Sequence, residues 1–133
     1  MYIIFLKYKY LISIFFPFVV AGCVSNNITN ERIVYSKYKA ICVLKSSGLN
    51  VKGGNPEIII INTKKQIKEE VNNLTGTYKY CPGFYCPMLE RIYLYKNSND
   101  IVITHEFMHY FLKQSCPELP LKMHHAIIHS LGY

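Results

Sequence analysis

The segment Ile101–Leu112 carries two histidines four residues apart in a stretch that is otherwise apolar nearly all round. Residues i and i+4 project from the same face of an α-helix, so this spacing places both imidazoles side by side. Asp100 is a good N-cap, and the helical pattern continues to about Gln114. A helix that is apolar on most sides is buried, so the segment predicts the central helix of the fold. Its apolar residues are Ile101, Val102, Ile103, Phe107, Met108, Phe111 and Leu112.

Within this helix, His105-Glu106-Phe107-Met108-His109 matches the pattern H-E-x-x-H. His105 and His109 can both reach one tetrahedral zinc ion at roughly 2.0–2.1 Å. Glu106 is rotated by about 100° from His105, which puts its carboxylate beside the metal, where it can take a proton from zinc-bound water. The alternative is a buried helix without metal. That alternative leaves buried polar groups in need of partners, so the sequence favours zinc.

The third zinc ligand is expected from the histidines that follow the motif, because all five histidines of the chain lie between His105 and His129. If the last helix begins at Pro120, its apolar stripe points toward the motif helix. His124 falls near the centre of that stripe, while His125 and His129 fall at its edge. We therefore rank His124 first and His125 second as ligand, and expect His129 outside the coordination shell. The stripe consists of Leu121, Ile127, Ile128 and Leu131.

Residues 1–22 have the layout of a secretory signal peptide: a short basic region, then an apolar run from Leu11 to Ala21 that is too short for a comfortable membrane span. The sequence Val20-Ala21-Gly22-Cys23 resembles the lipobox of bacterial lipoproteins. The resemblance implies cleavage before Cys23, acylation of that cysteine and attachment to a membrane. Val24 in the next position favours the outer membrane, facing the periplasm or the exterior. An ordinary signal peptide or an uncleaved anchor are the alternatives.

Four further cysteines, Cys42, Cys81, Cys86 and Cys116, lie in what would be an exported domain. An oxidising compartment and an even count predict two disulfides, for which three pairings exist. The formal net charge is +7, but the lysines are scattered and no nucleic-acid-binding signature is present. We therefore expect no nucleic-acid partner.

The pattern of the mature chain predicts a lipidated tether at residues 23–30 and one small α+β domain at residues 31–133. Continuous apolar runs and period-two alternation mark strands, while capping residues and helical spacing mark helices. The predicted elements are a helix from about Asn30 to Gly48, a buried strand at Glu57–Asn62, a helix capped by Thr63 that ends near Leu74, strands at Thr77–Tyr80 and Glu90–Lys96 around the Cys81–Cys86 loop, the motif helix, and a last helix from Pro120 to Gly132.

The chain resembles the zincin metallopeptidases, specifically small lipoprotein-type members, through residues 105–109 and the order of its elements. The resemblance implies zinc held by His105, His109 and a third ligand, with Glu106 as catalytic base acting on a protein or peptide substrate. It also implies that the strand before the motif is an edge strand that pairs with extended substrate. The metzincin extension is absent, because Leu112 and Ser115 occupy its positions.

The gluzincin extension is absent as well, since Glu118 follows the motif too soon. The competing hypothesis is a non-enzymatic envelope lipoprotein with a structural or partner-binding zinc site. Such a site needs the histidines but not Glu106, so the presence of this carboxylate favours the enzyme.

Overall fold

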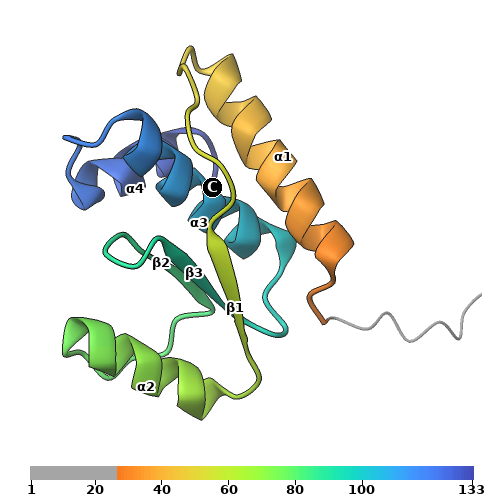
Figure 1. The fold of residues 1–133 in the computed structure, drawn as a ribbon, viewed down its shortest axis with the longest axis vertical. Coiled ribbons are helices and arrows are strands. Elements are labelled where there is room, and N and C mark those ends of the chain that lie inside the picture. Colours follow the sequence, from red (N-terminus) through yellow and green to blue (C-terminus); the bar gives the residue numbers. More distant parts are fainter. Residues whose placement is uncertain (1–26) are drawn as a thin grey trace, which may run out of the picture.

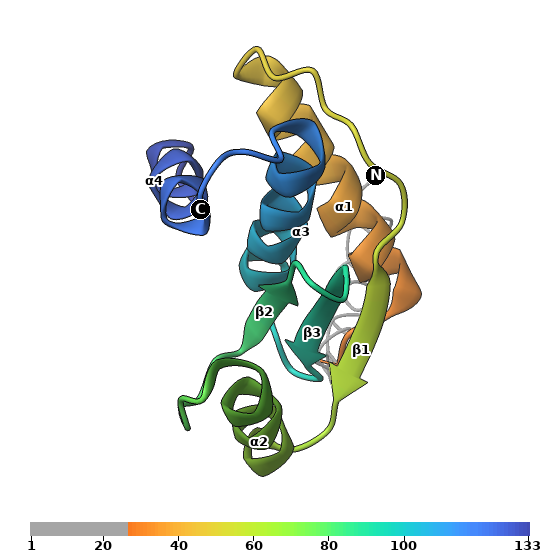
Figure 2. The ribbon, with the colours of Figure 1, turned by 60° about the vertical axis from the view of Figure 1, so that its left-hand side comes forward.

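The computed structural model describes residues 27–133, so the predicted signal peptide and Cys23 lie outside the described residues. Within 27–133 the chain is an α+β domain, as predicted, and no helix in that range is long and apolar enough to cross a membrane. Helix α2 covers one face of a three-stranded sheet and α3 the other, and α3 lies between α1 and α4 (Figures 1 and 2). The elements are α1 (Asn30–Ser46), β1 (Glu57–Ile61), α2 (Lys64–Thr75), β2 (Gly83–Cys86), β3 (Arg91–Tyr95), α3 (Asp100–Ser115) and α4 (Leu121–Ser130).

The sheet has the order β1-β3-β2, with β1 parallel and β2 antiparallel to β3. The alternation predicted for β3 is confirmed. Ile92 and Leu94 are fully buried in the cluster that includes α3, whereas Tyr93 and Tyr95 belong to the cluster beneath α2. Strand residues point alternately to the two faces, so β3 joins both halves of the core.

One strand is predicted in the wrong position. Thr77–Tyr80 is not a strand, because Tyr78 and Tyr80 lie along α2, where the ammonium groups of Lys68 and Lys64 sit 5.6 and 5.3 Å from their ring centroids. Instead, the predicted Cys81–Cys86 loop itself supplies β2, which antiparallel pairing to β3 holds in place.

The positions of strands within the sheet also differ from expectation. β1 is an edge strand rather than a buried one, since within residues 27–133 it pairs with β3 alone, and Ile60 remains 39% exposed. β3, expected at the edge, is central. The other edge strand is β2, which packs against the motif helix α3.

The helix ends follow ordinary capping chemistry. Thr63 caps α2 as predicted, accepting a 3.1 Å hydrogen bond from the Gln66 amide. The cap of α3 is Asn99 rather than Asp100, since the Asn99 side chain accepts from the Val102 amide at 2.9 Å. Asp100 lies instead in the first turn, where its carboxylate favours the positive end of the helix and pairs with Arg32 of α1 at 2.7 Å. The last helix is shorter than predicted and uses Pro120 as its cap.

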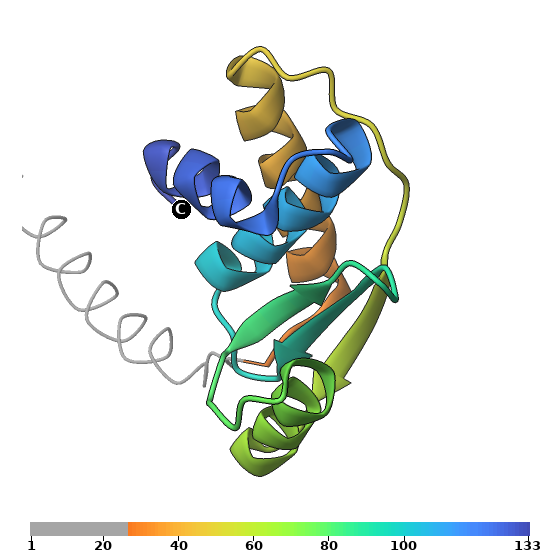
Figure 3. The same cartoon turned by 90° about the vertical axis from the view of Figure 1, so that its left-hand side faces the viewer.

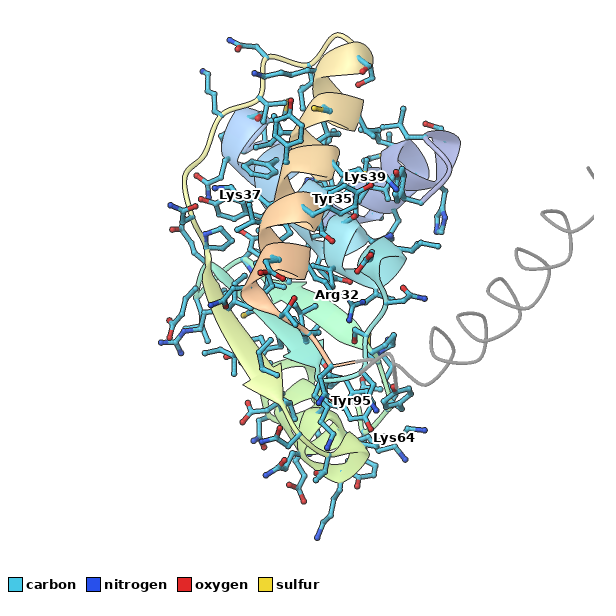
Figure 4. The ribbon with its side chains drawn as sticks, turned by 90° about the vertical axis from the view of Figure 1, so that its right-hand side faces the viewer. Arg32, Tyr35, Lys37, Lys39, Lys64 and Tyr95 are labelled. Atoms are coloured by element: carbon cyan, nitrogen blue, oxygen red, sulfur yellow. The ribbon has the colours of Figure 1, made fainter. Side chains whose placement is uncertain are left out.

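Helix α1 covers one side of α3 and presents a polar, aromatic face to solvent. Ala40 and Leu44 are fully buried in the core shared with α3, which confirms α3 as the central helix. On the opposite side, Tyr35 is 57% exposed, and Figure 4 shows it with Lys37 and Lys39 on this outer face.

Candidate metal centre

Helix α3 brings His105 and His109 together as the spacing predicts. Their Nε2 atoms lie 3.1 Å apart. Two nitrogen ligands of a tetrahedral zinc ion, at the usual zinc–nitrogen distance, are separated by about 3.3 Å. The pair is therefore already spaced for one ion. His109 is buried and His105 half-buried, which places the pair at the boundary of the core.

Helix α4 supplies the third histidine. Figure 3 looks onto α4 with α3 behind it. The ring of His125 lies 4.4 Å from that of His109 and 5.6 Å from that of His105, measured between centroids. One ligand atom from each of the three lies within 4.8 Å of the others, so the group can hold a metal ion.

His124 lies next to this group but outside it. Its ring is fully buried and stacks on His109 at 5.6 Å with an interplanar angle of 27°. Neither ring nitrogen is hydrogen-bonded, and the nearby Leu119 backbone lies outside hydrogen-bonding geometry. The order expected from the helical angles is thus reversed in the geometry. The centre of an apolar stripe points into the core, whereas a residue at its edge, His125, reaches the rim where the α3 pair ends.

Glu106 is buried beside the histidines, with only 7% of its surface exposed. Burial raises the pKa of its carboxyl to about 8, and a hydrogen bond from the Tyr85 backbone partly opposes this shift. Tyr85 lies on β2, whose outer edge has no strand partner among the described residues, and the hydrogen bond from its backbone links Glu106 to this strand.

The close approach of β2 to α3 depends on Gly83. A Cβ atom at this position would lie 2.9 Å from Val102 Cγ1 and 3.2 Å from Glu106 Cγ. The sequence reasoning did not single out Gly83 or Tyr85. A glycine inside a strand is a signal of close backbone approach, and it would have pointed to Gly83 once β2 was placed correctly.

The two α3 histidines, His105 and His109, are held in their neutral form. Burial, assisted by the neighbouring histidines, lowers the pKa of His109 to about 3 and also lowers that of His105. Neutral imidazole is the form that binds metal, so no proton competes for these nitrogens near neutral pH. His109 Nδ1 is buried without a hydrogen-bond partner.

A cavity of about 250 Å³ adjoins the site between α2, β2 and the two histidine-bearing helices. A larger cavity, of about 350 Å³, lies near Leu49 and Leu119 and contains no histidine in its lining. The smaller cavity is the one that the candidate catalytic groups face. Its lining consists of Val71, Thr75, Lys79, Cys81, Gly83, Phe84, Tyr85, Glu106, His109, Leu121 and His125.

The two predicted disulfides are not formed, since Cys42, Cys81, Cys86 and Cys116 are all free thiols. The Cys81 thiol donates to the Gly83 carbonyl at 2.7 Å, and burial raises its pKa. Cys86 is instead packed into the apolar cluster beneath α2. The two ends of the loop therefore have separate surroundings.

No known family model matches the chain, and no curated protein or solved structure shows significant similarity to it.

Proposed function

We propose that this chain is a lipid-anchored, zinc-dependent metallopeptidase or amide hydrolase of the bacterial envelope, with a small zincin-like domain. The observation that carries the proposal is the grouping of His105, His109 and His125 within 4.8 Å, beside the buried carboxylate of Glu106. Three histidines are a known catalytic zinc set, because they leave a coordination position open. The distance between the α3 histidines fits that metal.

The roles of the residues follow from their places. When bound, zinc supplies a Lewis acid that polarises a carbonyl group and acidifies water. Glu106 accepts the proton of the attacking water and then passes it to the leaving amine. A nearby cation lowers the pKa of a buried carboxyl, which brings Glu106 into the ionised form that a base requires.

The surroundings of Glu106 suit an extended peptide. The outer edge of β2 has no strand partner among residues 27–133, and an extended segment can add to such an edge through main-chain hydrogen bonds. The adjoining cavity, at about 250 Å³, is smaller than the roughly 300–1,000 Å³ of typical small-molecule sites. It fits one substrate side chain, and Val71, Phe84 and Leu121 in its lining favour an apolar one.

The membrane attachment rests on the lipobox resemblance at residues 20–23. An acylated Cys23 would hold the domain by a tether of a few residues, since α1 begins at Asn30. Two or more acyl chains give stable anchoring. The proposed partners are thus the membrane and a protein or peptide substrate.

Metal analysis and one substitution test the function together. We expect purified protein to hold about one zinc per chain, and His105→Ala, His109→Ala and His125→Ala each to lose most of it. Glu106→Gln is expected to retain zinc and lose hydrolysis of a peptide library. Zinc without any Glu106-dependent hydrolysis would instead support the non-enzymatic lipoprotein with a structural or partner-binding site. Absence of zinc from the wild type would refute both.

A further inference from the structure

Helix α4 carries its own pair of histidines at positions i and i+4, His125 and His129, opposite the pair on α3. Two adjacent helices therefore contribute one such pair each. The ring of His129 lies 6.1 Å from that of His105 and 6.3 Å from that of His125. The fourth histidine thus stands next to the group that the proposed function uses.

The ring spacings show how close His129 is to a ligand position. Imidazoles bound to one tetrahedral zinc ion have centroids roughly 5 Å apart, given the usual zinc–nitrogen distance. The three rings of the metal group are separated by 4.4, 4.8 and 5.6 Å. The ring of His129 is therefore about 1 Å farther from His105 and from His125 than the spacing of about 5 Å that shared coordination requires.

The ring of His129 can move by this distance. His129 is exposed near the end of α4, and among residues 27–133 its ring makes no hydrogen bond and faces the rings of His105 and His125 at 6.1 and 6.3 Å. Rotation about its side-chain bonds moves the ring without disturbing the core, which α4 holds through Ile128 and His124. Unlike His125, His129 does not line the cavity next to Glu106.

We propose that His129 is a fourth metal ligand that closes the site at rest and leaves when a substrate carbonyl arrives. The inference rests on the proposed function and adds its regulation. A site with four protein ligands is closed, whereas a catalytic site needs an open position. The position that His129 would vacate is the open one that the proposed function assigns to water and the substrate carbonyl. One bond from the metal to an imidazole nitrogen would be lost and one to an oxygen atom gained, with no change of oxidation state.

X-ray absorption spectroscopy of the zinc-loaded full chain tests the proposal directly, because it counts the imidazoles around the ion. We expect four in the wild type and three in His129→Gln. Lys122→Gln, also exposed on α4, serves as the matched control and is expected to show four. In chelator competition, His129→Gln should bind zinc at least tenfold more weakly than the control while still retaining it.

A second measurement reports access to the metal. In cobalt-substituted protein, azide should change the visible spectrum of His129→Gln at a lower concentration than that of the wild type or Lys122→Gln. Three imidazoles in the wild type, together with equal azide sensitivity in all three proteins, would overturn the closed state and leave the three-histidine centre intact. A wild type without zinc would overturn the proposed function itself. The number of imidazoles around zinc in the wild type tests the proposal even if a variant folds poorly.

Discussion

Gly83 on β2 lies so close to Glu106 on α3 that a methyl group at position 83 would come within 3.2 Å of Glu106 Cγ. Leu94 Cδ2 and Val102 Cγ1 would be closer still, at 3.0 and 2.9 Å. Overpacking of this kind costs about 1–3 kcal/mol. We expect Gly83→Ala to lower the free energy of unfolding in urea by that amount and to reduce hydrolysis, since β2 must move away from Glu106.

Gly54→Ala is the control for this experiment. A Cβ at Gly54 would meet no atom within 4 Å, and the hydrogen bond from its backbone amide to the Tyr110 hydroxyl survives the change. Its free energy of unfolding should stay within about 0.5 kcal/mol of the wild type. An equal loss of stability in both variants would show that β2 does not depend on the absence of a side chain at Gly83.

Substitution of the two neighbouring histidines of α4, His124 and His125, should affect zinc binding differently. His125→Leu removes a ligand of the central group and should hold clearly less than one zinc per chain. His124→Leu should retain about one zinc, because His124 is stacked behind His109 and outside the metal group. It should also leave the melting temperature unchanged or raise it, since it removes two buried nitrogens that lack hydrogen bonds. Metal analysis and calorimetry check both outcomes, and loss of zinc in His124→Leu alone would restore His124 as the ligand.

The pKa of Glu106 predicts a pH-dependent stability for the metal-free protein. Burial raises that pKa from 4.5 to about 8, so between these values the folded chain keeps a proton that the unfolded chain has released. Stability is therefore full below pH 4.5 and is lost as the pH rises toward 8. Glu106→Gln cannot titrate at this position. The free energy of unfolding of this variant should therefore exceed that of the wild type by an amount that grows across this window, to at most about 5 kcal/mol.

Urea unfolding of both proteins at several pH values, with chelator present, measures this difference. The advantage of Glu106→Gln should shrink when zinc is added to the wild type, because a bound cation favours the carboxylate. An advantage that is constant with pH would mean that Glu106 is ionised in the folded, metal-free chain.

Much of the arrangement follows from local sequence signals. The i, i+4 spacing placed His105 and His109 within reach of one ion, the Thr63–Gln66 pattern located the start of α2, and alternation in β3 divided its residues between two faces. Each of these rests on interactions between residues close in the chain, which is the range that periodicity and capping describe.

The errors arose where long-range packing decides the outcome. A short stretch such as Gly83–Cys86 becomes a strand only because β3 lies alongside it, and nothing local distinguishes it from a loop. The choice between His124 and His125 depends on how α4 is rotated against α3. A helical wheel gives the relative angles of two residues, but it does not say that the ligand sits at the edge of the buried stripe rather than at its centre.

His109 predicts acid sensitivity of the metal-free protein. Burial lowers its pKa from 6.5 to about 3, so below pH 6.5 the unfolded chain gains a proton that the folded chain cannot accept. The contribution to stability is complete above pH 6.5 and is lost as the pH falls toward 3. For this residue alone, the free energy of unfolding should drop by about 2 kcal/mol between pH 7 and pH 5. His109→Leu should remove that part of the pH dependence, whereas Lys122→Gln, at an exposed residue of α4, should keep it. The free energy of unfolding is measured by urea unfolding at several pH values with chelator present. An equal dependence on pH in the wild type and His109→Leu would show that His109 takes up a proton in the folded state, where the proton would compete with metal for its nitrogens.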